Sequence, residues 1–167
     1  LGTFEQLLVS PLSSGEIILG KTLPALFLGL VEATVMLVLG RVLLGVPVLG
    51  SLLLLYCSIV VYLLAVIGVG LFISSLAVTQ QQALLGGTVF IVPAVLLSGY
   101  ASPIENMPDW LQVLTYANPL RYFIIIVKGI MLKDMPLDLV LENLWPLALI
   151  ASVTFLAASW LFRHRME

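Results

Sequence analysis

Long apolar stretches separated by short polar interruptions make up most of the chain. Between Lys21 and Arg41 lie nineteen residues with a single charge, Glu32. Residues 42–104 carry no charge over 63 positions, and residues 143–162 form another uncharged stretch of twenty. A helix needs about 20 apolar residues to cross a hydrocarbon core about 30 Å thick. The pattern therefore predicts a fold made mostly of membrane helices.

Polar and turn-forming residues divide these stretches into spans. The uncharged stretch 42–104 is too long for one span and long enough for two. Glycine and proline at 45–51 predict one turn, and the polar run at 78–82 predicts the next. We therefore expect an all-α membrane protein with four spans, near 22–44, 50–76, 83–101 and 143–162.

The first residues have a different pattern. Thr3 and Gln6 fit a capping box that begins a helix, and Pro11 disfavours helix in the residue before it. A short helix is therefore predicted over 3–10. A second capping box at 13–16 begins a helix that continues into apolar sequence. We expect two parts, a segment at 1–20 that precedes the first span and a transmembrane domain at 21–165.

Residues 102–132 are neither polar enough for an ordinary loop nor long enough in one helix to span. One helix is expected from about 106–108 to 117, and another from 120 to about 132, with a break at Asn118-Pro119. The longer of the two reaches roughly 20 Å, which is less than the bilayer core. Both are rich in aromatic and aliphatic residues. We therefore predict a re-entrant helical hairpin before the last span.

Composition supports a lipid-embedded chain and excludes several functions. Hydrophobic residues make up 61% of the sequence and charged residues 10%, whereas a soluble domain has about 25% charged residues. The net charge of −2 argues against nucleic acid as a partner. One cysteine, Cys57, and one histidine, His164, predict no metal site. No serine is paired with a histidine and an acid, so no catalytic residue is predicted.

Residues 15–22 match the phosphate-binding pattern G-x-x-x-x-G-K-[ST]. That pattern works between a buried strand and a soluble helix, where backbone N–H groups wrap the phosphates. Here a predicted helix precedes it and Leu23-Pro24 lead into a membrane span. We therefore interpret the match as a coincidence, and expect the chain to have no ATPase site of its own.

Glu32 is the charged residue inside a predicted span. A carboxylate there costs about 2.5–3.5 kcal/mol on insertion scales, so it should face a bundle interior or an aqueous path. Two interpretations stay open: Glu32 lies on a substrate path, or it makes a structural contact between helices or lies near one interface. On the first, Glu32, Met36 and Phe90 would line a mostly apolar translocation path, which favours a hydrophobic or amphipathic substrate.

Eight residues of the predicted hairpin are candidates for a gate. They combine prolines, amides, charges and an indole. Glu105, Asn106 and Arg121, together with Asp109, either bind a ligand at the membrane edge or cap the hairpin and anchor its two arms. The eight candidates are Pro103, Glu105, Asn106, Pro108, Trp110, Asn118, Pro119 and Arg121.

Five short motifs occur in an order and spacing typical of one family. They are residues 2–12 (GTFEQLLVSPL), 19–21 (LGK), 79–83 (TQQQA), 97–99 (LSG) with 103–108 (PIENMP), and 118–123 (NPLRYF). Together they make the chain resemble the ABC-2 type permease family, the membrane subunits of ATP-binding cassette exporters, in its bacterial drug-efflux-like branch. The resemblance covers nearly the whole chain.

The resemblance implies a full permease of six spans, with the third to the sixth in this chain. Because the chain starts at Leu1 within the pattern, we expect it to be the C-terminal portion of a longer protein. The resemblance also implies a bacterial inner-membrane protein with both ends of this segment cytoplasmic, an orientation that the charge count leaves undecided. It further implies that 1–20 is a cytoplasmic coupling-helix segment, whose short helix at 3–10 would contact the ATPase through Thr3, Phe4, Glu5, Gln6 and Leu8.

The expected function is that of a permease subunit of an ABC exporter, which forms the path and couples to a separate ATPase. Its expected partners are that ATPase subunit, a second permease copy, the lipid bilayer and, as a further candidate, a periplasmic adaptor. The chain itself is expected to bind no cofactor, with ATP and magnesium on the ATPase. The alternative is an ATP-independent carrier or channel subunit, for which repeated spans with broken helices are typical. The sequence shows no convincing repeat of that kind.

Overall fold

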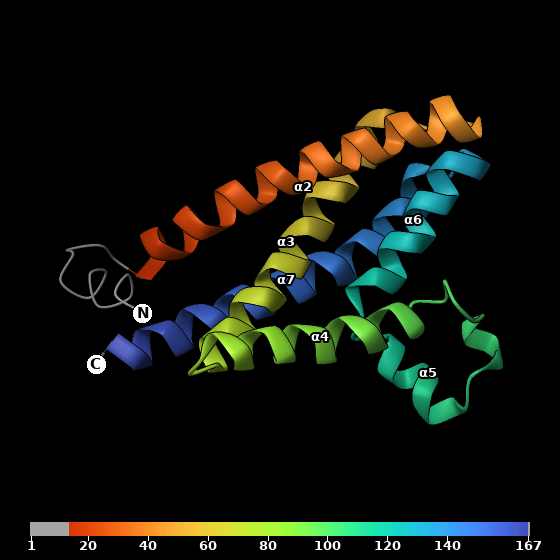
Figure 1. Ribbon diagram of the computed structural model, residues 1–167. Helices are drawn as coiled ribbons and strands as arrows, with labels where there is room; N and C mark the ends of the chain where they lie inside the picture. Colours follow the sequence, from red (N-terminus) through yellow and green to blue (C-terminus); the bar gives the residue numbers. More distant parts are fainter. Residues whose placement is uncertain (1–13, 167) are drawn as a thin grey trace.

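The computed structural model describes the backbone of residues 14–166 and the side chains of residues 15–163, and its regular structure there is all helical (Figure 1). The predicted helix at 3–10 lies outside these residues. The elements in chain order are α2 (Ser14–Leu44), α3 (Leu52–Leu76), α4 (Gln80–Leu96), the 3-10 helix η1 (Ile104–Asn106), α5 (Asp109–Thr115), α6 (Pro119–Lys133) and α7 (Leu137–Met166). The predicted all-α class is confirmed.

Three helices are long and apolar enough to cross a membrane. They are the segments Gly15–Leu44, Leu52–Leu76 and Leu137–Arg163. The predicted span at 50–76 agrees with α3 to within two residues. The other two helices are longer than the predicted spans at 22–44 and 143–162, because those predictions began after the charged residues Lys21 and Glu142, and the second also stopped before Arg163. A helix continues through charged residues where it leaves the apolar region, as α7 does at Asp138 and Glu142.

Helix α4 occupies most of the remaining predicted span, at 83–101, but is shorter. The glutamine-rich turn begins it with a capping box, in which the Gln82 backbone N–H donates to Thr79 Oγ1 at 3.2 Å. The helix has 17 residues and ends at Leu96, not at 101. Gly99, at φ +82°, has a left-handed backbone that a right-handed helix cannot continue. At about 25 Å, α4 falls short of the three long helices.

Helices α3 and α7 form the centre of the bundle and run parallel. Gly68 of α3 lies directly against Thr154 and Phe155 of α7, where even an added Cβ would collide with the Thr154 hydroxyl. Three clusters of buried side chains follow this contact from one end to the other: Leu55 with Val140, Ala65 with Leu147 and Ala151, and Leu71 with Ala158. The first turns of α2 and the last turns of α7 lie at the same end of the molecule (Figure 1).

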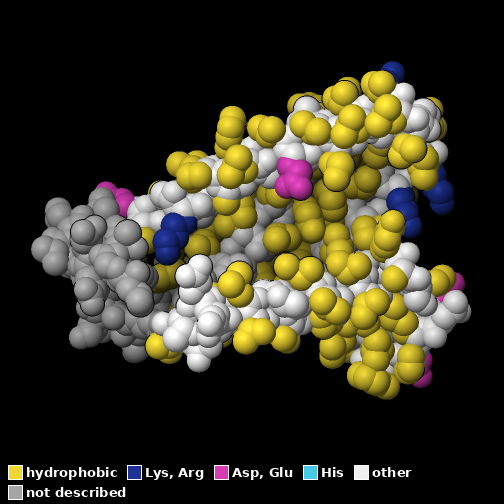
Figure 2. All heavy atoms as spheres, viewed as in Figure 1, with side chains coloured by type: hydrophobic (Ala, Val, Ile, Leu, Met, Phe, Trp, Pro, Cys, Tyr) yellow, Lys and Arg dark blue, Asp and Glu magenta, His cyan; other side chains and the backbone are white. Residues whose placement is uncertain are grey.

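The remaining helices cover the central pair unequally. Helix α6 packs between α3 and α7 with its buried residues Ile126 and Ile130. Helix α4 has no buried residue. Most of α2 is likewise exposed, with Phe27 67% and Met36 65% accessible. Figure 2 shows a hollow with an apolar floor between α2 and α4. The described chain therefore exposes two apolar helices on either side of a tight core.

Candidate functional site

Glu32 lies in the middle of α2 with its side chain exposed. Within residues 15–163, its carboxylate has no hydrogen-bond or ion-pair partner. A polar contact between α2 and α3 does exist nearby, but other residues make it: Thr34 Oγ1 lies 3.0 Å from the Tyr56 hydroxyl oxygen. Because Thr34 donates its own hydroxyl proton to the Leu30 carbonyl at 2.7 Å, Tyr56 must be the donor to Thr34. Among the described residues, this pair makes a polar contact between α2 and α3, and Glu32 makes none.

Met36 lines a cavity of about 270 Å³ between α2, α3 and α6. Its position one turn after Glu32 places the two on the same face of α2. The lining is almost entirely apolar, with Met36, Leu37 and Gly40 from α2, Leu55 and Ile59 from α3, and Phe123, Val127 and Met131 from α6. Ala33 and Val46 complete it. The cavity lies toward the end of the bundle where α3 begins.

Phe90 lies in α4 and is half-buried. It is not one of the residues that line the cavity beside Met36. The three residues proposed for the path are therefore divided in the described chain. Glu32 and Met36 share one face of α2, whereas Phe90 belongs to the loosely packed helix on the other side of the hollow in Figure 2.

The outer part of the candidate gate begins with two prolines that each precede a short helix. Pro103 comes before η1, and Pro108 comes before α5. Glu105 and Asn106 lie in η1 and are exposed. The side chain of Trp110, in the first turn of α5, is 67% accessible. The prolines shape this segment, while the polar and aromatic side chains point away from the bundle core.

Asn118 forms the joint between the two arms, and it is buried. Its Oδ1 accepts from the Leu120 backbone N–H at 3.1 Å, which caps α6, while its Nδ2 donates to the Ala94 carbonyl at 2.7 Å. Pro119 then occupies the first position of α6, where a missing N–H costs nothing. The predicted break at Asn118-Pro119 is confirmed. The joint also ties the hairpin to the last turn of α4.

Helix α6 runs from the middle of the bundle to one end. Near its start, the Phe123 ring stacks on Tyr62 of α3 with centroids 4.0 Å apart, and Tyr62 lies close to the midpoint of α3. Near its end, the Ile130 carbonyl accepts from the Gly50 backbone N–H at 2.9 Å, just before α3 begins. The joint at Asn118 is therefore level with the middle of the long helices.

Arg121 lies in the first turn of α6 and folds back over the joint. Its guanidinium lies 4.2 Å from the centre of the Tyr116 ring, and Nη1 donates to the Thr115 hydroxyl. Its Nε is buried and has no hydrogen-bond partner among the residues that the structure describes. The Tyr122 hydroxyl donates to the Tyr116 carbonyl at 2.9 Å. The Arg121 side chain therefore stabilises the turn between α5 and α6.

The segment that matches the phosphate-binding pattern is the first part of helix α2. The hydroxyl of Thr22 is buried and donates to the Ile18 carbonyl at 2.8 Å. The Lys21 ammonium lies 5.2 Å from the centre of the Phe162 ring on α7. The Thr22 hydroxyl is thus engaged inside the bundle, Lys21 is exposed beside the Phe162 ring, and the backbone is helical where a phosphate loop would be required.

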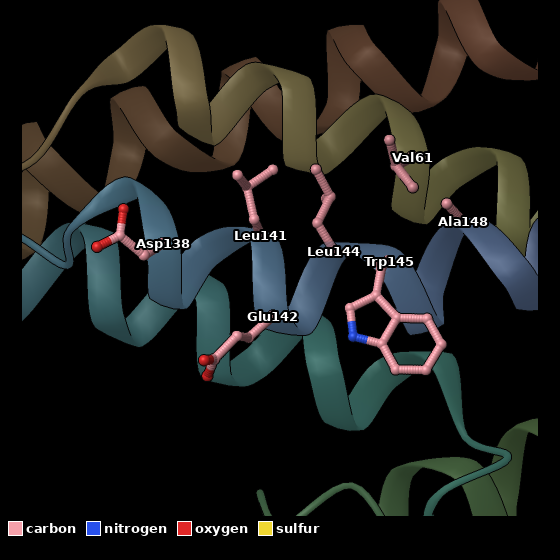
Figure 3. Close-up of a pocket in the computed structure, with 7 residues that line it drawn as sticks. All are labelled: Val61, Asp138, Leu141, Glu142, Leu144, Trp145 and Ala148. Carbon is pink, nitrogen blue, oxygen red and sulfur yellow. The ribbon is translucent and has the colours of Figure 1, made fainter.

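An open pocket of about 460 Å³ on α7 contains two acids that the sequence reasoning did not single out (Figure 3). Asp138, Glu142 and Trp145 lie at spacings of four and three residues, so they share one helix face, and Val61 of α3 completes the far side. The spacing was a signal available in the sequence. The acids are exposed at the end of the helix, where an ordinary solvated face accounts for them.

Comparison with known proteins gives one family. Residues 1–132 match the family model described as "ABC-2 type transporter". The chain is 51% identical over 165 residues to the probable multidrug ABC transporter permease YbhR of Escherichia coli K12, covering 99% of the chain and 45% of the relative. It is 33% identical to the probable multidrug ABC transporter permease YbhS and 29% identical to the inner membrane transport permease YhhJ, both of the same strain, covering 98% and 97% of the chain and 44% of each relative. The chain thus spans about half the length of the curated relatives it matches. No solved structure shows a significant match.

Proposed function

Because the chain belongs to the ABC-2 type transporter family, we propose that it is part of the permease subunit of an ABC exporter. The observation that carries this proposal is the similarity over almost the whole chain to a protein named as a probable multidrug ABC transporter permease. The three long apolar helices are what a membrane path requires. In this proposal the chain forms the path, and a separate ATPase supplies the energy.

The proposed topology has four crossings, made by α2, α3, α4 and α7. Helix α4 completes its crossing with the residues that follow Leu96, because a span of about 25 Å is near the lower limit for a bilayer. Residues 102–132 form a re-entrant hairpin that dips from the outer side to mid-depth and returns. Its support is the position of the Asn118 joint, level with the middle of α3 and bonded to α4.

In the assembly that we propose, these are the third to sixth spans of a six-span permease in a bacterial inner membrane. Both ends of the segment are cytoplasmic. A second permease copy, identical or different, completes the path, and a periplasmic adaptor is a further partner. The chain binds no cofactor, and ATP with magnesium is bound by the ATPase subunit.

The proposed mechanism moves α2 against a fixed core. Closure of the ATPase dimer pushes the coupling helix at 3–10, and α2 tilts because it is a continuous helix of 31 residues that leads away from that helix. The tilt costs little free energy because most of α2 is exposed. Helices α3 and α7 stay in place because they pack tightly against each other at Gly68. The hairpin at 102–132 then acts as the outer gate of the path.

Reversing the chemistry of the coupling helix should separate the ATPase from the permease. Changing Glu5→Lys together with Leu8→Asp in the full-length protein is expected to abolish co-purification of the ATPase and to leave membrane insertion intact. The reason is that one substitution inverts a charge and the other puts a carboxylate into the apolar side of the contact. Pull-down from solubilised membranes measures the result.

A matched control places the same charge changes at the other side of the membrane. Glu105→Lys with Ala101→Asp alters two exposed residues near η1 and should leave the ATPase bound. Retention of the ATPase by the coupling-helix variant would defeat the docking proposal.

A further inference from the structure

The cavity between α2, α3 and α6 has room that no described side chain fills. It measures about 270 Å³, enough for a short alkyl chain or a small ring system. An added Cβ at Gly40 would meet nothing within 4 Å, so the α2 wall is open at that point. Met36 and Met131 both line it, and methionine adapts its shape to different apolar ligands. The cavity thus suits the apolar part of a small molecule.

A carboxylate lies one helical turn from the α2 wall of this apolar space. Glu32 is one helical turn from Met36 on the same face of α2, about 6 Å along the helix axis. Its carboxylate is exposed and has no partner among residues 15–163. Arg41, the other charged residue in the second half of α2, is nine residues away, about 13.5 Å along the axis. A ligand with a positive charge about one turn from its apolar end would complement both features.

We propose that Glu32 and the cavity beside Met36 form a binding site for small cationic amphiphiles, with the apolar part in the cavity and the cationic group at Glu32. This site rests on the proposed function, of which it specifies the substrate class. It lies within one permease copy, between three of its own helices.

The charge of Glu32 decides between a cation and the other apolar occupants. A phospholipid with an acyl chain in the cavity would bring its phosphate toward the carboxylate together with any ammonium of the same headgroup, so the headgroup has no net positive charge to pair with Glu32. A helix of a second permease copy is about 10 Å wide and cannot enter a space of this volume, and an apolar side chain reaching in from it would leave Glu32 unmatched. A cationic amphiphile matches the volume, the apolar lining and the charge together.

Binding of a matched pair of probes to the full-length permease with its ATPase, in nanodiscs without nucleotide, tests the site. The probes are radiolabelled decyltrimethylammonium and the neutral decyldimethylamine N-oxide at pH 8, with empty nanodiscs as background. Saturable binding is expected to favour the cation about tenfold, and Glu32→Gln should remove that preference. Met36→Trp, which fills the cavity, should weaken binding of both probes. Gly40→Leu fills it from another position and serves if Met36→Trp does not fold.

Val38→Trp is the matched control, because Val38 is on α2, is 54% exposed and lines no part of this cavity. It should bind both probes as the unchanged protein does. Equal affinity for the two probes, a cation preference that survives Glu32→Gln, or a retained phospholipid that Met36→Trp displaces would each overturn the proposal. Absence of saturable binding in a complex that still co-purifies with its ATPase would reject this site and leave the permease function standing. Loss of the ATPase from a permease that still binds the cation would reject the permease function and leave this site standing.

Discussion

Replacing Gly68 by leucine is expected to destroy the central helix pair. Even a Cβ at this position collides with the hydroxyl of Thr154 and comes within 3.0 Å of the Phe155 ring, so α3 and α7 must separate to admit the side chain. Overpacking of a tight core costs about 1–3 kcal/mol and sometimes more, and this position is at the upper end because α7 itself must shift. A loss of about 3 kcal/mol lowers the melting temperature by roughly 6–12 °C in a protein of this size.

Gly70, two residues further along the same helix, provides the control. An added Cβ there meets nothing within 4 Å, so Gly70→Leu should leave the bundle intact. Thermal unfolding of both variants in detergent, followed by size-exclusion chromatography, measures the difference. Equal melting temperatures would show that α3 and α7 are not in close contact at Gly68.

Asn118→Leu is expected to release the hairpin from α4 and to abolish transport. The substitution removes the cap of α6 and the bond from Nδ2 to the Ala94 carbonyl, and it leaves the Leu120 N–H without its side-chain acceptor. Losing a helix cap costs about 1 kcal/mol, and each buried group left unsatisfied costs about 1–3 kcal/mol. We therefore expect about 3 kcal/mol of lost stability, concentrated at the joint that our account assigns to the outer gate.

The matched control for this substitution is Asn143→Leu. Asn143 lies in α7, outside residues 102–132, and its Nδ2 donates to the Leu139 carbonyl of the same helix at 2.9 Å in an exposed hydrogen bond. Transport of a substrate and protease access to residues 102–132 should change in Asn118→Leu and not in Asn143→Leu. A fully active Asn118→Leu complex would remove the hairpin joint from the mechanism.

Local sequence signals predicted most of the helices. The apolar run of α3 and the break at Asn118-Pro119 are found where the pattern placed them, because backbone chemistry and residue type decide both. The predicted ends of α2, α4 and α7 were less accurate. Charged residues mark where a helix leaves the lipid, and the helix itself can continue beyond that point. The end of α4 was misplaced because the left-handed backbone at Gly99 was not anticipated.

The sequence predicts the candidate site only for the residues that lie on one helix. Glu32 and Met36 share a face of α2 by spacing alone, but the cavity depends on the approach of α6, which no periodicity encodes. The glycines illustrate the same limit. Of the four glycines at 68, 70, 86 and 87, Gly68 and Gly86 would meet a neighbour through an added Cβ, whereas the other two would meet nothing within 4 Å, and no sequence pattern separates the two pairs.

The measurement that tests the account most directly is the nucleotide dependence of transport. The full-length permease and its ATPase are reconstituted in proteoliposomes, with a compound that stimulates ATP hydrolysis by the complex as the cargo. Movement of that cargo should require ATP and magnesium, and should stop when a non-hydrolysable analogue replaces ATP or when the ATPase is catalytically inactive. Cargo movement at an undiminished rate without nucleotide would contradict a permease driven by a partner ATPase and would favour a carrier or channel.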